Sequence, residues 1–555
     1  SDPSAVLTVT KAYSSTSYTS MPMFGTLFIH DGLLAAIVAL AITGSMLHSV
    51  YFNWRHTQKS RKLGCEKAPL YPSQDPFGIS TLRETLDAAR EKLLPQLAER
   101  RVAFLSRRHD RYVSTFRICQ AGRENFLTTD PKNIQAMLAT QFKDFGLGDM
   151  RRNVASPVVG HGIFTTDGES WARSRSLLRP QFTRDQMNNL DREEYHVQNA
   201  LHVIPTLSNG WSSPVDIQAV FFRLTLDSAT EFLFGKSCDS QITAMQKETG
   251  QASDDSFLYG FDRCMWYLAE RLRFERLYWV IYNKEFKKCI KILHSFVDRY
   301  VNCALKEVHQ LEERVHSTEE PKSQYTFLKA LTGTTKDPVR LRDESLNVLL
   351  AGRDTTASLL SWSILLLARH SNMFARLRSD ILKEFGTYDQ PKNMDFASLK
   401  SCQYLQHFLN ETLRLYPVVP FNRRCALTDT TLPRGGGKDG TSPVYLRKGR
   451  TVMYSTYVLH RRKDIWGEDA EIFNPDRWIG RKVAWEYIPF NGGPRTCIGQ
   501  QFALMRSSYV LVRLLQKFDK VEDVHSEREI RYGVSLTSCP ADSVTVRLHQ
   551  AEVEG

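Results

Sequence analysis

The fold is decided by ten residues near the C-terminus, Phe490-Asn491-Gly492-Gly493-Pro494-Arg495-Thr496-Cys497-Ile498-Gly499. The glycines allow a tight backbone that closely approaches the Cys497 sulfur. A free cysteine titrates near about pH 8.5, so a thiolate at neutral pH needs a metal or donated N–H groups to stabilise it. Apolar residues recur at helical spacing from Phe502 to Leu515, which predicts a helix beginning just after Gly499. Because a helix N-terminus favours an anion, we expect Cys497 to be a deprotonated metal ligand.

The composition excludes some classes of protein. The chain has 555 residues, 42% hydrophobic and 24% charged, with a formal net charge of +12. It has no long Lys/Arg block and no nucleic-acid-binding motif, so we do not expect nucleic acid as a partner, and a basic face toward an acidic protein or an anionic membrane fits better. Its ten cysteines form no C-x-x-C pair and no zinc spacing, as is typical of a reduced compartment with single buried thiols.

An uncharged stretch near the N-terminus, residues 32–54, predicts a transmembrane anchor. A helix of that length spans about 34 Å, slightly more than the roughly 30 Å of a bilayer core. Arg55, Lys59, Arg61 and Lys62 follow directly and place that side in the cytosol. A cleaved signal peptide fits less well, because the run is long and its basic residues come after it. We therefore expect a lumenal tail at 1–31, a basic and proline-rich linker at 55–78 and a single cytosolic body at 79–555.

Helical patterns dominate the body, most clearly at 82–105 and 345–374. Short β-like runs occur at 444–446, 452–454 and 544–546, whereas the polar stretches 237–256 and 319–326 are typical of loops. We expect a mostly α protein with small β-sheets (α+β). Residues 257–293 mix aromatic and basic side chains, which fits either a membrane-dipping helix pair or an ordinary amphipathic pair with a solvated basic face.

The segment Ala351-Gly352-Arg353-Asp354-Thr355-Thr356-Ala357 places polar residues in a strongly apolar helix. A carboxylate and two hydroxyls are locally unfavourable there, and such a conflict often marks a functional site. We expect Thr355 to hold a water and Asp354 to connect it to solvent for proton delivery. The alternative is a structural kink with a buried, satisfied polar pair.

A further group of charged residues stands out near the middle of the C-terminal half. Glu411 and Arg414 lie on one face of a helix that must end at Leu415-Tyr416-Pro417, and Arg477 could join them in a buried network that serves fold specificity rather than catalysis.

Trp171 and Arg175 are four residues apart and so share a helix face. Both are N–H donors suited to a buried carboxylate ligand, and Arg424 and Arg495 are further candidates.

Taken in order, these motifs resemble those of the cytochrome P450 superfamily. W-x-x-x-R begins at 171, A-G-x-D-T-T contains 354, E-x-x-R begins at 411, P-x-R-W contains 477 and F-x-x-G-x-R-x-C-x-G contains 497. The resemblance covers about 79–555 and implies a helix-rich prism with a small β domain. It implies haem b with Cys497 as axial thiolate, in a pocket formed by Trp171, Arg175, Arg424, Phe490, Arg495 and Gly499.

A closer likeness is to the fungal members that hydroxylate alkanes and fatty acids. It rests on Gly162-Ile-Phe-Thr-Thr-Asp-Gly168, on Leu432-Pro-Arg-Gly-Gly-Gly437 and on the Phe490–Arg495 stretch. Three residues depart from that pattern: Lys438 stands where a proline is expected, Asp476 replaces a glutamate and Thr166 replaces a leucine.

The resemblance implies a monooxygenase that hydroxylates the terminal or near-terminal carbon of a long aliphatic chain. It would use O₂ and electrons from NADPH–cytochrome P450 reductase, with cytochrome b5 as a further candidate donor, at the endoplasmic reticulum membrane. The same chemistry on a polyketide, terpenoid or aromatic metabolite stays open. An isomerase that rearranges a peroxide, or a non-catalytic haem protein, is disfavoured because neither needs Asp354 and Thr355. By family position, we expect substrate contacts from the 145–165 loop and from Leu349, Ala351, Val419 and Leu536.

Overall fold

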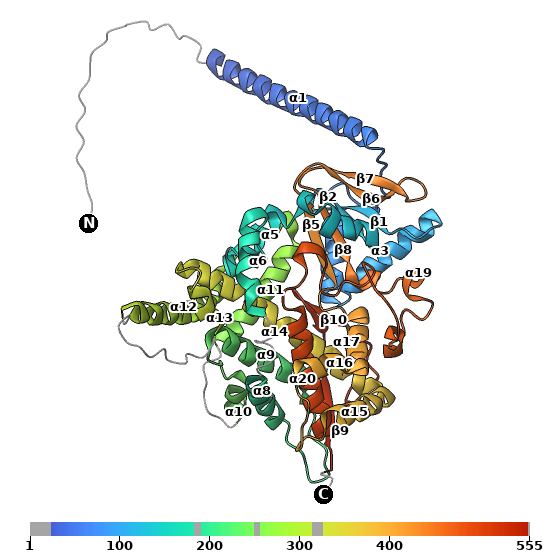
Figure 1. The fold of residues 1–555 in the computed structure, drawn as a ribbon. Coiled ribbons are helices and arrows are strands. Elements are labelled where there is room, and N and C mark those ends of the chain that lie inside the picture. The colour runs from blue at the N-terminus through green and yellow to red at the C-terminus, as the bar shows by residue number, and fades with distance from the viewer. Residues whose placement is uncertain (1–23, 183–189, 249–255, 314–325, 553–555) are drawn as a thin grey trace, which may run out of the picture. The chain divides into compact units, whose positions relative to one another are not determined.

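The computed structural model describes residues 24–182, 190–248, 256–313 and 326–552 (Figure 1). The chain divides into two compact units, one up to Leu63 and one from Gly64 onward. Most of the expected tail 1–31 and of the expected loop 319–326 lies outside the described residues.

The first unit contributes one long helix, α1 (Phe24–Lys62). Its described residues 36–62 contain an 18-residue window with a mean hydropathy of 1.4, so the helix is long and apolar enough to cross a membrane. The helix begins before Gly32 and continues past Trp54 to Lys62, because the basic residues that follow the apolar run are good helix formers. It ends where Gly64 adopts a positive φ of 62°, a conformation that favours glycine. Residues 55–62 therefore extend the helix instead of forming a linker.

The second unit is mostly helical (Figure 1). Its helices are α2 (Ile79–Arg90), α3 (Leu94–His109), α4 (Pro131–Gln135), α5 (Gly148–Val159), α6 (Gly168–Leu178), α8 (Asp191–His202), α9 (Ile217–Phe234), α10 (Ser240–Glu248), α11 (Ser256–Arg273), α12 (Lys284–Glu313), α13 (Phe327–Thr332), α14 (Pro338–Arg369), α15 (Ser371–Phe385), α16 (Phe396–Ser401), α17 (Gln403–Leu415), α18 (Thr456–Leu459), α19 (Lys463–Trp466) and α20 (Gln500–Lys517). Short π- and 3₁₀-turns are η1 (Ala136–Thr140), η2 (Phe142–Asp144), η3 (Arg179–Phe182), η4 (Glu275–Val280), η5 (Pro475–Trp478) and η6 (Gly493–Arg495).

Both long helical patterns are confirmed as helical but contain a break. The first, 82–105, is divided between α2 and α3 at Lys92, whose φ is 63°, and Pro95 in the first turn of α3 needs no N–H partner. The second, 345–374, is divided between α14 and α15 at His370. Apolar spacing continues across both breaks, so periodicity alone did not reveal them.

The prediction of a loop over 237–256 is wrong for residues 240–248, which form α10. The N-terminus of α10 is capped from another helix: the Asp227 carboxylate of α9 accepts the N–H groups of Ser240 at 2.7 Å and Gln241 at 3.1 Å. A cap from a distant residue leaves no local sequence signal.

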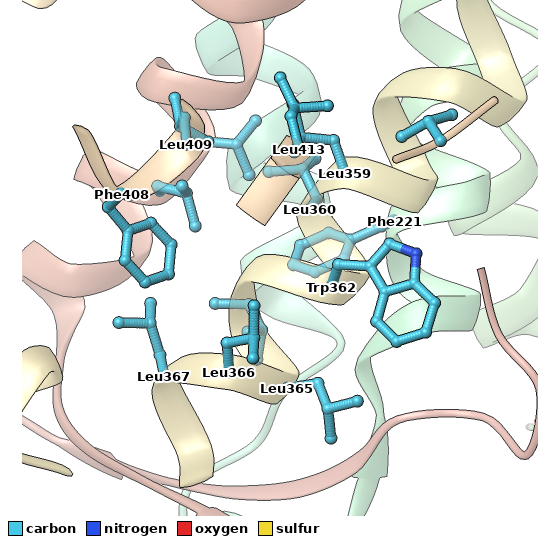
Figure 2. Close-up of a cluster of buried hydrophobic side chains, with 14 of the residues drawn as sticks. Phe221, Leu359, Leu360, Trp362, Leu365, Leu366, Leu367, Phe408, Leu409 and Leu413 are labelled. Carbon is cyan, nitrogen blue, oxygen red and sulfur yellow. The ribbon is translucent and has the colours of Figure 1, made fainter. Parts of the chain in front are cut away.

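The core is built around α14 (Figure 2). Leu360, Trp362 and Leu367 of α14 are fully buried, and they lie among Phe221 of α9 and Phe408 of α17. Burying an aromatic or leucine side chain stabilises the fold by about 1.5–3 kcal/mol each, so α14 is fixed firmly in the middle of the unit. The candidate residues Asp354 and Thr355, which also lie on α14, are therefore held on a rigid element.

The sheets are small and lie beside the helical core (Figure 1). The largest has the order β1-β2-β8-β5-β3, with β2 and β8 parallel and the other pairs antiparallel. Its strands are β1 (Thr115–Gln120), β2 (Arg123–Thr128), β3 (Phe145–Gly146), β5 (Phe421–Ala426) and β8 (Thr451–Ser455). The other sheets pair β6 (Thr430–Gly436) with β7 (Ser442–Leu446), β10 (Tyr532–Val534) with β11 (Ser538–Pro540), and β12 (Thr545–Gln550) with both β4 (Val215–Asp216) and β9 (Phe518–Asp523). The three predicted β-like runs are confirmed in β7, β8 and β12.

Candidate active site

The loop that carries Cys497 lies directly before the N-terminus of α20. The Cys497 N–H donates to the Phe490 carbonyl at 2.9 Å and closes the loop. Gly493 has a φ of 65°, and a Cβ there would meet the Leu138 carbonyl oxygen at 1.8 Å, so the close approach of this loop to η1 requires glycine. The helix start predicted after Gly499 is confirmed at Gln500.

The Cys497 side chain is accessible, yet much of the protein surrounds it. This burial raises the pKa of its thiol, whereas the Gly499 N–H and the Arg175 guanidinium lower it. Protein groups alone thus favour the thiol, and a bound cation would be needed to hold the thiolate at neutral pH.

The structure brings Trp171, Arg175 and Arg495 together beside the cysteine loop. Arg175 of α6 donates to the carbonyl of Thr496 at 3.0 Å. The Arg495 guanidinium lies over the Trp171 ring, 4.4 Å from its centroid, and donates to Asp167 Oδ1 at 2.7 Å. Trp171 and Arg175 thus lie on the same face of α6, as their four-residue spacing predicts.

Arg424 of β5 is also buried near this group, and a second arginine lies beside it that the sequence did not single out. Arg151 of α5 donates to Asn422 Oδ1 at 3.3 Å, and Arg424 donates to the same oxygen at 3.3 Å. The only hint in the sequence was its place in the 145–165 region, from which we expected substrate contacts. Its partners lie about 270 residues away along the chain, so no local motif could identify it.

These arginines form a cluster with an excess of buried positive charge. Burial and the nearby guanidiniums lower the pKa of Arg495 to about 9, although Asp167 acts in the opposite direction. Burial and Arg424 likewise lower the pKa of Arg151 to about 10. The Arg495 Nε atom is buried with no hydrogen-bond partner among the described residues. A further anion at this place would relieve both the charge and the unmet donor, and the two propionates of haem have the required chemistry.

The proton-delivery candidates lie on α14, which is continuous through Gly352. The Thr355 hydroxyl donates to the Ala351 carbonyl at 2.7 Å, which fixes the side chain and leaves its oxygen able to accept a hydrogen bond. The Asp354 carboxyl is buried, and burial raises its pKa to about 6 although Arg353, at 3.2 Å, lowers it. Asp354 thus has a pKa suited to holding and releasing a proton near neutral pH.

Glu411, Arg414 and Arg477 are in contact at the junction of α17 and η5. Both Glu411 carboxylate oxygens accept from Arg414 at 2.8 Å, and Oε1 also accepts from Arg477 Nε at 3.3 Å. The indole N–H of Trp478 and the backbone N–H of Asn474 complete the set, at 3.0 and 2.9 Å. Glu411 and Arg414 are fully buried.

The four substrate candidates lie on three segments of the chain, two of them on α14. Val419 and Leu536 are partly exposed, and their segments lie side by side because the Ser538 N–H donates to the Val418 carbonyl at 2.8 Å. Ala351 shares the face of α14 with Thr355, but Leu349 is six residues before Thr355 and thus about 120° around the helix. Leu349 is fully buried in a core cluster, and Leu536 packs against the same cluster.

The aromatic and basic segment 257–293 forms α11, η4 and the start of α12, and its side chains divide into two sets. Phe261 and Phe286 are buried in a core cluster. Trp279, Val280 and Tyr282, at and just after η4, are exposed, and the exposed Arg276 and Lys284 flank them in the chain. The helices are thus amphipathic, with an exposed apolar patch at their connection.

A comparison with protein families identifies the class of protein. The family model for cytochrome P450 matches residues 92–540, and the chain belongs to this family. The predicted helix-rich fold is confirmed: a solved cytochrome P450DA haem domain matches 88% of this chain and 98% of its own length with a TM-score of 0.68 and 21% identity. Family and fold together imply a haem iron.

Among individual proteins, the chain is similar to named fungal members of the family. It is 46% identical to cytochrome P450 monooxygenase g430 of a Fusarium species, covering 93% of this chain and 90% of the relative. It is 43% identical to cytochrome P450 monooxygenase alt2 of Alternaria solani, covering 90% and 94%, and 46% identical to cytochrome P450 52A10 of Candida maltosa, covering 78% and 84%. The chain is therefore a cytochrome P450 monooxygenase, an enzyme.

Proposed function

We propose that the protein hydroxylates long aliphatic chains, alkanes or fatty acids, at or near the terminal carbon. The observation that carries the oxygenase assignment is the accessible Cys497 before α20, beside a buried cluster of arginines with excess positive charge. This arrangement combines one sulfur ligand for a metal with a site that needs carboxylates.

The group that fits this pocket is haem b. Cys497 would be its sulfur ligand, and its propionates would be held by Trp171, Arg175, Arg424, Arg495 and the newly identified Arg151. Phe490 and Gly499 shape the loop under the sulfur through their backbone carbonyl and N–H. When bound, the haem supplies the activation of O₂ that amino-acid side chains cannot provide.

The residues of α14 manage the protons. Thr355, fixed by its hydrogen bond to Ala351, accepts a hydrogen bond from a water in the pocket, and Asp354 supplies protons to that water from the solvent side. Because Asp354 is buried and its pKa is raised, it exists in both protonation states near neutral pH. The two residues thus deliver protons without opening the pocket to bulk water.

The aliphatic substrate class is supported by the resemblance to the alkane- and fatty-acid-hydroxylating members. Thr166, which stands where those members have a leucine, does not weaken this support. It introduces no free hydroxyl, because Thr166 is buried and its hydroxyl donates to the Gly162 carbonyl at 2.8 Å. Its own carbonyl accepts from Arg495 at 3.0 Å. The substitution therefore does not add polarity to the candidate pocket.

The membrane and electron partners follow from the same assignment. We place α1 across the endoplasmic reticulum membrane as a single span, with the catalytic unit in the cytosol and NADPH–cytochrome P450 reductase, assisted by cytochrome b5, as electron source. The exposed patch of Trp279, Val280 and Tyr282 provides a second contact with lipid, through which an apolar substrate enters.

A spectral binding screen of the purified full-length holoenzyme tests the substrate class. Long-chain fatty acids and alkanes should displace the water from the iron and shift the Soret band, and the product formed with NADPH and reductase should carry a terminal or near-terminal hydroxyl. Shifts with aromatic acids or polyketides alone would instead favour a specialised metabolite as substrate. Product formation from a hydroperoxide without reductase would indicate an isomerase.

A further inference from the structure

A partly buried ion pair connects the proton-delivery helix to the helix α11. Arg353 precedes Asp354 in the chain, and its Nη1 atom lies 2.5 Å from Asp262 Oδ1 on α11 and 3.2 Å from Asp354 Oδ1. Arg353 and Asp354 are 4% and 7% exposed, whereas the Asp262 side chain is 54% exposed. One guanidinium therefore joins a buried carboxyl to a carboxylate at the surface.

Packing holds the guanidinium in this place. Arg353 lies over the ring of Phe261 at 4.9 Å and over the ring of Phe222 at 5.2 Å. The two rings and the two carboxyl groups leave the Arg353 Nε atom with no partner among the described residues. Since a buried arginine charge needs an opposite charge nearby, the position of Arg353 depends on both carboxyl groups.

The other titratable groups that face this cluster are thiols. Cys539 of β11 faces Asp354, and burial raises the pKa of its thiol to about 12. Cys238, which follows α9, faces Arg353, and burial together with Asp227 raises the pKa of its thiol. Both are neutral at physiological pH, so Asp262 and Arg353 supply the charges that act on Asp354.

We propose that Asp262 is a positioning residue for proton delivery, which shares the Arg353 guanidinium with Asp354 and prevents Arg353 from pairing with Asp354 alone. The inference rests on the proposed role of Asp354. Without the Asp262 charge, Arg353 would have a single carboxylate partner and would stabilise the anion of Asp354. Asp354 would then hold its proton less readily at neutral pH, and fewer electrons would end in product.

The test uses the full-length holoenzyme with reductase and a substrate from the screen, and compares Asp262→Asn with the wild type. The amide keeps the shape of the side chain and removes its charge. We expect unchanged binding spectra, a severalfold loss of product formed per NADPH at neutral pH, and a pH profile of this coupling that moves to lower pH. Asp262→Glu should restore most of the coupling.

A matched control is available on α12. Asp298 is also a half-exposed aspartate and faces an arginine of α14, Arg342, at 3.6 Å, but it lies far along α14 from Asp354. Asp298→Asn should behave as wild type.

The inference is overturned if Asp262→Asn keeps wild-type coupling and pH profile while Thr355→Ala is uncoupled. It is also overturned if coupling falls equally at every pH and Asp262→Glu does not restore it, which would indicate a structural defect. If Thr355→Ala and Asp354→Asn themselves stay coupled, the proposed proton delivery is wrong, and the inference fails with it.

Discussion

Replacing Glu411 by alanine tests the physical account of the fold most severely. The carboxylate of Glu411 is fully buried and accepts five hydrogen bonds, two from Arg414 and one each from Arg477, Trp478 and Asn474. Glu411→Ala removes all five at once. It leaves Arg414, which is also fully buried, without its counter-ion.

The expected cost follows from this geometry. Arg414 keeps its hydrogen bonds to the carbonyls of His460 and Ala470, and Arg477 keeps its ion pair with Asp469. Neither guanidinium therefore loses all of its hydrogen-bond acceptors. The Arg414 charge itself stays buried and uncompensated, and breaking such a pair costs about 3–5 kcal/mol. A domain is commonly stable by only about 5–15 kcal/mol, so the variant should lose a large part of its stability.

The assay is urea denaturation of the full-length holoenzyme in detergent, followed by the carbonmonoxy Soret band and by circular dichroism. Asp87→Ala is a matched control, since Asp87 pairs with Arg90 at the same three-residue spacing but on an exposed surface, where the pair contributes little. We expect a large fall in the urea midpoint for Glu411→Ala and almost none for Asp87→Ala. Equal midpoints for the two variants would refute the reasoning.

Three further predictions concern the haem pocket, a buried acid and the membrane contact. Arg151→Met should weaken haem retention measured by transfer to apomyoglobin, whereas Arg152→Met, the adjacent arginine that pairs with Asp149 at the surface, should not; equal transfer rates would contradict the role of Arg151. Burial raises the pKa of Glu344 to about 7, so the folded protein keeps a proton that the unfolded chain releases, and stability should fall as pH rises from about 4.5 past 7. Glu344→Gln should remove that part of the pH dependence in melting temperatures at about pH 5 and pH 8, and an unchanged dependence would show that Glu344 ionises normally. In bilayers, Trp279→Phe should lower the fraction of tryptophan fluorescence that brominated lipids quench, and an unchanged fraction would place the exposed Trp279 in water.

The sequence predicted most of what depends on local chemistry. The glycines around Cys497, the helix that follows it and the polar interruption of α14 are neighbours in the chain, so their motifs could be read directly. The β-like runs of β7, β8 and β12 were visible in the sequence because the strand signal is contained within a few neighbouring residues.

Features that depend on distant residues were not predictable. The pairing of Arg151 with Asn422 and of Arg353 with Asp262 joins residues that the sequence does not relate, and α10 is capped by Asp227 of another helix. The break at Lys92 was hidden for a different reason, because apolar spacing continues across it and only the positive φ reveals the turn. Each of these depends on packing in three dimensions, which a linear pattern does not encode.

The most direct test of the whole account concerns the sulfur of residue 497. The reduced, full-length protein is exposed to carbon monoxide, and the Soret band of Cys497→Ser is compared with that of wild type and of Cys303→Ser, an exposed cysteine on α12. The account predicts the haem-thiolate band in wild type and Cys303→Ser and its loss in Cys497→Ser. A thiolate band that survives in Cys497→Ser would contradict the account, because another residue would then bind the iron.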